Sequence, residues 1–361
     1  MTRLVMLAAG GTGGHLFPAQ ALAEALARRD VAVELMTDER VRDYGKDFPA
    51  RRVHEIPAAT LSLSDPLRVP GRMARLLRGF LKARAVLAKA RPAAVVGFGG
   101  YPSLPPLLAA AALGIPVIIH EQNAVMGRAN RLLSRFATAI ASSFPKIANL
   151  DSQAAAKLAF TGNPVRAKVR ARAGAAYGKP GKTFELLVFG GSQGARFFAD
   201  FMPDAIAALD EKARAGLHIT QQCRPEDMER VGKAYGQLGI GHELATFFAD
   251  MPERMARAQL VMGRSGASTI AELGVIGRPA LLVPLPNALD NDQLRNAESF
   301  VAAGAGWILP QRELTAAGFA AFFSEIRADS EGLARKAAAA LKAGEPEAAE
   351  KLAELVLRLA R

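Results

Sequence analysis

The chain of 361 residues has a single cysteine, Cys223. One thiol cannot form a disulfide within the chain, and it cannot supply the cluster of thiolates that a cysteine-rich zinc site needs. The sequence therefore favours a protein of a reducing compartment.

Tryptophan and tyrosine are also scarce, with one Trp and four Tyr, although the formal net charge is +12. Such a charge attracts polyanions, which include nucleic acid, anionic lipid and phosphorylated substrates. Surfaces that bind single-stranded nucleic acid interleave aromatic side chains with the cations. Because that pattern is missing, we expect no nucleic-acid partner.

Charged side chains are absent from residues 93–119, a stretch that resembles a membrane span. Prolines and glycines interrupt it and divide it into short pieces. These residues are Gly97, Gly99, Gly100, Pro102, Pro105, Pro106, Gly114 and Pro116. We therefore interpret the stretch as a strand, a loop, a helix and a strand, all buried.

Short apolar runs alternate with helical patterns along most of the chain. This alternation predicts an α/β protein with two doubly wound parallel sheets. The predicted strands lie at 3–9, 31–37, 92–98, 115–120, 138–143, the start of 184–195, 217–223, 244–248, 258–264 and 278–285. The tail, 331–361, is rich in Ala, Lys and Glu and predicts two helices that are broken at 343–346.

A polar, basic stretch rich in glycine and proline, 159–182, separates the two halves. We place the domain linker there, at about 164–183. The expected domains are 1–163 and 164–343, with a C-terminal helix in 344–361 that packs back on the first domain. Ligands of open α/β sheets bind beyond the carboxyl ends of the strands, so we expect a cleft between the two halves.

Two glycine-rich turns, at 10–14 and 190–194, each follow a predicted strand and open a helix. Glycine lets a ligand approach the backbone, and a helix N-terminus suits phosphate, so each turn is either an anion site or simply a tight turn. A dinucleotide fingerprint from Gly11 would need glycine at Leu16, and neither turn has the lysine of a P-loop. A hydride-transfer enzyme and an NTPase are therefore disfavoured.

His15 follows the first glycine turn directly, where the predicted helix begins. The dipole of a helix N-terminus favours a neutral imidazole over the cation. A neutral imidazole that faces a cleft can act as a general base. The alternative is a histidine that forms local hydrogen bonds and braces the loop.

Six motifs occur in a fixed order: "GGTGGHLFPAQALAEAL", "GFGGYPS", "HEQNAVMGRANRLL", "TGNPVR", "FGGSQGA" and "RSGASTIAEL". From residue 3 to about residue 310 the chain thus resembles the MurG family of UDP-N-acetylglucosamine (UDP-GlcNAc) transferases. The resemblance implies a GT-B fold, two Rossmann-like doubly wound parallel-sheet domains that face each other across a cleft. It also implies an inverting reaction without a cofactor. The 4-hydroxyl of polyprenyl-linked N-acetylmuramoyl-pentapeptide attacks UDP-GlcNAc, UDP leaves, and a β-1,4 bond forms in the peptidoglycan precursor.

The resemblance further implies which residues contact the substrates. Residues 12–14 match the glycine loop near the phosphates, and Phe248 lies where the family holds the uracil ring. We expect His15 to be the general base, with Glu121 as the reserve candidate. The implied contacts are Thr12, Gly13, Gly14, Asn123, Arg166, Ser192, Phe248, Ala267, Ser268, Thr269, Ile270, Ala271, Glu272 and Gln293.

Five of these matches carry a specific chemical role. Ser192 matches a contact to the diphosphate. Arg166 matches a residue that meets the nucleotide-sugar, and its permanent guanidinium charge suits a leaving diphosphate. Asn123 and Gln293 match amides that contact the donor sugar. Glu272 matches the carboxylate that accepts hydrogen bonds from the ribose diol.

The segment "PLPNALDNDQLRNA" (284–297) departs from the family pattern. Asp292 stands where the family more often has His or Gln. With Asp290 it spells the D-x-D of metal-dependent transferases, which we interpret as coincidence. GT-B enzymes of this kind stabilise the leaving diphosphate with a helix dipole and basic groups, so we expect no metal.

Residues 67–92 carry eight Lys or Arg and no acidic residue. Apolar side chains recur at helical spacing, which predicts a basic amphipathic helix of the kind that binds membrane interfaces. The alternative is a surface helix whose apolar face lies in the core. The resemblance favours a peripheral protein on the cytoplasmic face of the bacterial inner membrane, bound to its anionic surface. The expected contacts are Arg72, Arg75, Leu76, Phe80 and Lys82.

Two other functions stay open. UDP-GlcNAc 2-epimerases share the fold and the donor, but they need no acceptor and no basic amphipathic helix. A membrane-bound scaffold that retains the fold without activity is disfavoured by the intact "GGTGGH" and "RSGASTIAE" segments.

Overall fold

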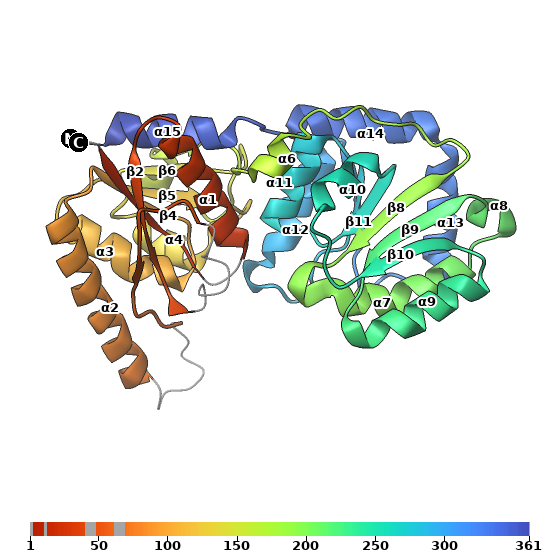
Figure 1. The fold of residues 1–361 in the computed structure, drawn as a ribbon, viewed down its shortest axis with the longest axis horizontal. Helices are drawn as coiled ribbons and strands as arrows, with labels where there is room; N and C mark the ends of the chain where they lie inside the picture. The colour runs from red at the N-terminus through yellow and green to blue at the C-terminus, as the bar shows by residue number, and fades with distance from the viewer. Residues whose placement is uncertain (1–2, 11–12, 40–47, 61–68, 361) are drawn as a thin grey trace. The chain divides into compact units, whose positions relative to one another are not determined.

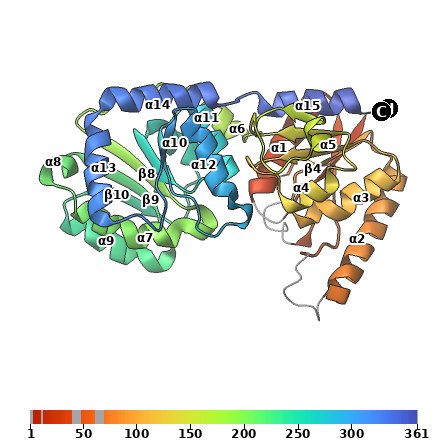
Figure 2. The ribbon, with the colours of Figure 1, turned by 180° about the vertical axis from the view of Figure 1, so that it is seen from behind.

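The computed structural model describes residues 3–10, 13–39, 48–60 and 69–360, and every structural statement below concerns these ranges. The chain divides into two compact units, Met1–Ala167 with Glu345–Arg361 (unit 1) and Lys168–Gly344 (unit 2). The divisions after 167 and 344 lie four residues and one residue beyond the expected boundaries at 163 and 343. Each unit is described by itself (Figures 1 and 2).

Unit 1 contains a seven-stranded parallel sheet in the order β3-β2-β1-β4-β5-β6-β7 (Figure 1). The five predicted strands of this half are confirmed, and two short ones are added. β3 carries charged, largely exposed side chains, so it has no apolar run that would identify it. The strands are β1 (Leu4–Ala8), β2 (Ala32–Thr37), β3 (Arg52–Glu55), β4 (Ala94–Gly97), β5 (Val117–Glu121), β6 (Ala139–Ser142) and β7 (Leu158–Phe160).

Successive side chains of β1 point to opposite faces of the sheet, and unit 1 has an apolar cluster on each face. Val5 and Leu7 point into the cluster that α1 and α15 cover, whereas Met6 and Ala8 point into the cluster under α2 and α3. Residues 93–119 form β4, η3, α3 and β5, as predicted. The helices are α1 (Gly13–Ala27), α2 (Val69–Ala90), η3 (Tyr101–Ser103), α3 (Leu104–Ala112), α4 (Arg128–Leu133), α5 (Ser152–Ala155), α6 (Ala167–Arg170) at the unit boundary, and α15 (Ala348–Leu359).

The last helix of the chain, α15, packs beside α1 in unit 1 (Figure 1). Its apolar side chains, among them Leu352 and Val356, complete the cluster on that face of the sheet. Glu350 forms ion pairs with Arg28 and Arg29, which directly follow the end of α1, at 2.6 and 2.9 Å. The N-terminal half therefore depends on the C-terminal helix for part of its core.

Unit 2 contains a six-stranded parallel sheet in the order β10-β9-β8-β11-β12-β13. The strand predicted at 244–248 lies three residues earlier, because this edge strand pairs with β9 alone and needs few apolar side chains. The strands are β8 (Phe184–Phe189), β9 (Leu217–Gln222), β10 (Gly241–Ala245), β11 (Leu260–Gly263), β12 (Ala280–Leu282) and β13 (Gly306–Ile308).

Helices cover the sheet of unit 2, and its main apolar cluster lies against α7 and α13. The two helices predicted in the tail are confirmed as α14 and α15. No helix among the described residues is long and apolar enough to cross a membrane. The helices are α7 (Gly191–Ala207), α8 (Glu211–Arg214), η4 (Pro225–Asp227), α9 (Met228–Gln237), α10 (Met251–Arg257), α11 (Ala267–Ile276), η5 (Leu289–Asn291), α12 (Asp292–Ala302), α13 (Ala316–Ala328) and α14 (Ser330–Ala343).

Candidate functional site

Each sheet has one point at which the order of its strands reverses, between β1 and β4 in unit 1 and between β8 and β11 in unit 2. Ligands of open α/β sheets bind at such switch points, beyond the carboxyl ends of the strands. The glycine motifs at 10–14 and 97–100 follow β1 and β4, and those at 190–194 and 264–269 follow β8 and β11. Both switch points are thus bordered by the motifs that the sequence singles out.

The first glycine turn in unit 1 begins at a closely packed position, Gly10. A Cβ at Gly10 would lie 3.0 Å from the Cβ of Pro102 and 3.1 Å from oxygens of Asp38 and Thr37. Gly13 and Gly14 are the first residues of α1, so their N–H groups belong to the open end of that helix. Thr12, the remaining predicted contact here, lies outside the described residues.

His15 lies against the loop that follows β4. Gly99 and Gly100 both have positive φ, at 79° and 69°, which favours glycine at these positions. A Cβ at Gly100 would be 3.4 Å from Nε2 of His15, so the imidazole lies beside the Gly100 backbone. The loops after β1 and β4 therefore meet at the histidine that the sequence nominates as the base.

A buried histidine, His120, connects three of the motifs. Its Nε2 donates to the carbonyl of Gly162 at 3.2 Å, while Gln122 Nε2 lies 3.1 Å from its Nδ1 and donates to Phe98 O. Burial, opposed by the Gly162 bond and reinforced by His15, lowers the pKa of His120 to about 4. This imidazole is therefore neutral at neutral pH and holds the ends of β4 and β5 and the "TGNPVR" loop in register.

Glu121, the reserve base, is 1% exposed. Its Oε1 accepts a hydrogen bond from the Asn123 N–H at 2.9 Å, and its Oε2 accepts from the Gly127 N–H at 3.0 Å and Asn130 Nδ2 at 2.8 Å. Burial raises the pKa of this carboxyl despite the bonds that it accepts. The geometry makes Glu121 the anchor of the loop that presents Asn123.

Arg166 lies beside the start of α1. Its guanidinium lies over the ring of Phe17, 4.5 Å from the centroid. That ring in turn lies close to the first glycine turn, because a Cβ at Gly13 would be 2.8 Å from it. The fold thus gathers His15, Arg166 and the loop of Asn123 at the carboxyl end of one sheet, although His15 and Arg166 are 151 residues apart in the sequence.

In unit 2 the nucleotide segment predicted at 267–272 forms the start of α11, directly after β11. The side chain of Ile270 is buried, whereas those of its five neighbours in this segment are half-buried. Ser265 Oγ donates to the carbonyl of Gln293 at 2.8 Å, and Asn296 Nδ2 donates to the carbonyl of Ser265 at 3.1 Å. These bonds place Gln293, at the start of α12, beside the nucleotide segment.

The aromatic pair at 247–248 divides into one buried and one exposed ring. Phe248 is 5% exposed, and the guanidinium of Arg254 lies over it, 4.2 Å from the centroid. Phe247 is 73% exposed. A ligand can therefore reach the ring of Phe247. The sequence does not single it out, since no pattern shows which of two adjacent phenylalanines is buried. The side chain of Ser192, on α7, lies outside what the structure describes.

In the D-x-D sequence, the Asp292 carboxylate takes part in a local hydrogen bond. Asp292 Oδ1 accepts a hydrogen bond from the Gln293 N–H at 2.8 Å. Burial, opposed by this bond and reinforced by the charge of Asp290, raises the pKa of Asp292. Among the described residues, no three His, Cys, Asp or Glu side chains cluster closely enough to hold a metal ion.

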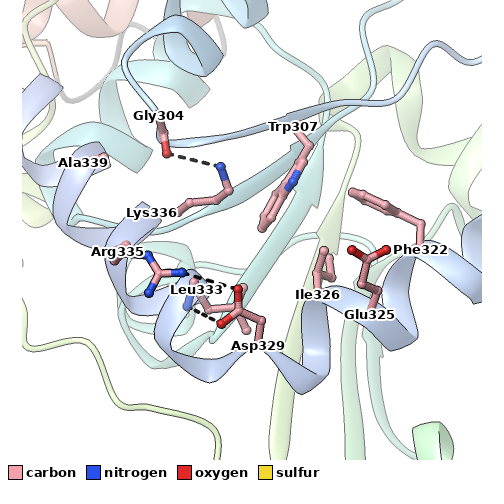
Figure 3. A pocket seen from close by; sticks show the side chains of 11 residues that line it. Gly304, Trp307, Phe322, Glu325, Ile326, Asp329, Leu333, Arg335, Lys336 and Ala339 are labelled. Carbon is pink, nitrogen blue, oxygen red and sulfur yellow. Dashed lines mark hydrogen bonds and ion pairs between the residues drawn. The ribbon is translucent and has the colours of Figure 1, made fainter.

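A pocket of about 490 Å³ lies elsewhere in unit 2, between the edge strand β13 and helices α13 and α14 (Figure 3). Trp307 of β13 forms one wall, with Lys336 Nζ 4.4 Å from the centre of its ring. Phe322 meets the same ring edge-on. None of the six motifs contributes a residue to this pocket, so it is separate from the switch point of unit 2.

Two doubly wound parallel sheets, each with phosphate-compatible loops at its switch point, are the architecture of GT-B nucleotide-sugar transferases. The comparisons agree. Residues 5–142 match the glycosyltransferase family 28 N-terminal domain, and residues 185–352 match the glycosyltransferase family 28 C-terminal domain. The chain belongs to glycosyltransferase family 28.

Curated relatives cover nearly the whole chain. A protein of Rhizobium etli, named UDP-N-acetylglucosamine–N-acetylmuramyl-(pentapeptide) pyrophosphoryl-undecaprenol N-acetylglucosamine transferase, is 48% identical over 360 residues, 99% of this chain and 96% of its own length. A protein of Sinorhizobium fredii with the same name is 49% identical over 358 residues, 99% of this chain and 95% of its own length.

Solved structures show the same architecture. The crystal structure of Acinetobacter baumannii MurG matches with a TM-score of 0.82 and 29% identity, over 99% of both chains. UDP-GlcNAc 2-epimerase from Neisseria meningitidis matches with a TM-score of 0.67 at 14% identity, over 99% of this chain and 100% of the other. The second likeness shows a shared fold alone, so the epimerase alternative has less support than the transferase.

Proposed function

We propose that this chain transfers GlcNAc from UDP-GlcNAc to the 4-hydroxyl of polyprenyl-diphospho-N-acetylmuramoyl-pentapeptide, with inversion at the anomeric carbon. One observation carries the proposal. All six sequence motifs lie at or directly after the carboxyl ends of strands in their own unit, where ligands of such sheets bind. Relatives at 48–49% identity are named for this transfer, which supports the same substrates here.

Unit 1 holds the acceptor in this proposal. The glycine turn and the N-terminus of α1 bind phosphate through backbone N–H groups. His15, at the same turn, takes the proton of the attacking hydroxyl as the new bond to the anomeric carbon forms. Glu121 and His120 do not touch the substrate; they hold Asn123 and the surrounding loops in place.

Unit 2 holds the donor. Phe247 and the backbone of Phe248 meet the uracil, and Glu272 accepts hydrogen bonds from the ribose. The N-terminus of α11 faces the diphosphate, so its dipole favours the charge that accumulates as UDP leaves. Gln293, beside Ser265, forms hydrogen bonds with hydroxyls of the sugar.

The epimerase alternative differs in its need for an acceptor. Incubated with UDP-GlcNAc alone and followed by proton NMR, the protein is expected to leave the configuration at C2 of the sugar unchanged. Steady conversion to the 2-epimer in the absence of acceptor would favour the epimerase instead.

We also propose that the protein acts as a peripheral protein at the cytoplasmic face of the bacterial inner membrane, where α2 meets anionic lipid. Met73, Leu77 and Leu81 recur every four residues on α2 and are 53%, 58% and 55% exposed. The predicted contacts Leu76 and Phe80 are half-buried against the core. The reducing compartment favoured by the single cysteine supports the cytoplasmic side.

Charges on α2 flank this apolar stripe unevenly. Arg75 forms an ion pair with Glu39 at 2.7 Å, which offsets its charge. Arg78 and Lys82 make no ion pair with a described residue, so their charges are available to anionic headgroups. Arg72 and Lys82 remain predicted contacts. Each cation near an anionic surface contributes about 1 kcal/mol.

Replacing Met73, Leu77 and Leu81 together by serine is expected to lower binding to phosphatidylglycerol vesicles at least about tenfold, since each apolar side chain that leaves water contributes about 1.5–3 kcal/mol. Turnover of a short-chain, water-soluble acceptor should be unchanged. Leu341→Ser, on the 43% exposed leucine of α14, is the matched control and should leave vesicle binding intact. Equal losses in the vesicle and soluble-acceptor assays would make the stripe structural.

A further inference from the structure

Arg278 is a charged side chain buried in unit 2, 1% exposed, just beyond the end of α11. Gly277 ends that helix in the left-handed conformation, at φ 78°. The N–H groups of Gly277 and Arg278 both donate to the carbonyl of Leu273, at 2.9 and 3.0 Å. This Schellman-type turn reverses the chain and directs the Arg278 side chain back into the unit.

The guanidinium donates only to backbone carbonyls, and these belong to three different segments. One acceptor ends α10, two end α11, and two lie in the chain segment that enters unit 2. Five bonds to these carbonyls are 2.8–3.1 Å long. Nη2 forms a sixth bond, to the same α10 carbonyl that accepts from Nε. The acceptors are Ala256, Ile276, Gly277, Ala175 and Ala176.

No carboxylate of a described residue pairs with Arg278. A buried charge without a counter-ion is costly unless its hydrogen bonds are all made. Here all three guanidinium nitrogens find acceptors, and the ends of α10 and α11 supply negative helix-dipole charge. The ring of Tyr177, 5.6 Å away, adds a favourable face for the cation.

The entering segment, 174–178, is bonded to the rest of unit 2 along its length. Gly174 N–H donates to the carbonyl of Val275 at 3.0 Å. Tyr177 OH donates to Gln259 O at 2.9 Å, and Gln259 Nε2 returns a bond to Gly178 O at 3.1 Å. Arg278 supplies the two bonds in the middle of this series, so the segment is held to the end of α11 through it.

We propose that Arg278 is a positioning residue of the donor site, which fixes α11 along its axis by tying its end to α10 and to segment 174–178. The inference rests on the proposed role of 267–272 in nucleotide binding. Glu272 lies only four residues, one helical turn, before Ile276, whose carbonyl Arg278 holds. A shift at this end of α11 therefore moves the proposed ribose ligand.

Arg327 provides a matched control. Its guanidinium is also buried in part, donates to the carbonyls of Ala213 and Ala215, and lies 5.3 Å from the ring centroid of Phe184. Burial lowers the pKa of both guanidinium groups. Arg327, on α13, anchors α8, and the carbonyls to which it donates lie outside α11, so Arg327→Met removes the same chemistry elsewhere in the unit.

The test measures the Kd for UDP by calorimetry, together with kcat and KM for UDP-GlcNAc and the Tm, in Arg278→Met, Arg278→Lys and Arg327→Met. Arg278→Met should raise the Kd for UDP and the donor KM about tenfold or more, the loss expected for a charged hydrogen bond, with kcat changed less than about twofold. Arg278→Lys keeps the positive charge but loses the planar guanidinium with its several N–H donors. Its Kd for UDP and donor KM should lie between those of Arg278→Met and of the unmodified chain. It also provides the test if the methionine variant fails to fold. Arg327→Met should lower the Tm with the Kd unchanged.

Hydrogen exchange locates the effect. Arg278→Met should lose amide protection both at 174–178 and in α11. An unchanged Kd for UDP in both Arg278 variants, with exchange raised only at 174–178, overturns the proposal and leaves a purely structural anchor. If the unmodified chain binds no UDP, the proposed function itself fails, which is a separate outcome.

Discussion

Replacing His15 by alanine is expected to lower kcat by about 10²–10⁴-fold, the usual contribution of a general base. The loops after β1 and β4 meet at this imidazole, which in the proposed mechanism accepts the proton of the sugar hydroxyl. The Kd for UDP should change little, because the proposed nucleotide contacts lie in unit 2. Steady-state kinetics and calorimetry measure the two quantities.

His242→Ala is the control for this substitution. This histidine, in unit 2, forms a local hydrogen bond from its ring to the carbonyl of Ile240 and belongs to none of the motifs. Its removal should leave kcat unchanged. If His15→Ala retains most of its kcat, or loses UDP binding instead, His15 is a loop brace and the base must be sought at Glu121.

Replacing Glu121 by alanine is expected to destabilise unit 1 by at least about 3 kcal/mol, because each buried donor left without an acceptor costs about 1–3 kcal/mol. The three donors are the N–H groups of Asn123 and Gly127 and the amide of Asn130. Denaturant unfolding measures the loss. Activity should fall as well, since Asn123 loses its fixed position.

A milder variant separates the anchoring role of Glu121 from a role as the base. Glu121→Gln keeps the shape but turns one acceptor oxygen into a donor that faces another donor. We expect a lower Tm and a pH profile of kcat with its acidic limb retained. A stable Glu121→Gln protein that loses the acidic limb would contradict the anchoring role. Glu24→Ala, at a half-buried position of α1 that accepts a single hydrogen bond from Gln20, should cost less than about 0.5 kcal/mol.

Much of the fold could be predicted because apolar runs and glycine turns alternate so regularly. The charge-free stretch 93–119 is correctly divided by its prolines and glycines into β4, η3, α3 and β5. The exceptions are short edge or near-edge elements. β3, β7 and β13 have three or four residues each, too few for an alternating pattern to be recognised, and each is an edge strand that pairs with a single neighbour.

The candidate site was only partly predictable. Local signals are enough to nominate His15 as a candidate, because a helix start after glycines has a recognisable sequence. The anchoring network of Glu121 and His120 depends on partners as far away as Gly162, which no local pattern connects. Arg278 looks like an ordinary surface cation in the sequence, since only tertiary packing brings five carbonyls to its guanidinium. Likewise, only burial distinguishes Phe247 from Phe248.

The most direct test of the account is transfer of labelled sugar. The protein is incubated with UDP-[¹⁴C]GlcNAc, with and without a synthetic polyprenyl-diphospho-muramoyl-pentapeptide, and the label in the lipid fraction is counted. We predict label in the lipid only when the acceptor is present, in a product with a β-1,4 bond, and with UDP released in equal amount. Label that stays in the water-soluble nucleotide fraction, with the acceptor present and the protein folded, would contradict the central claim.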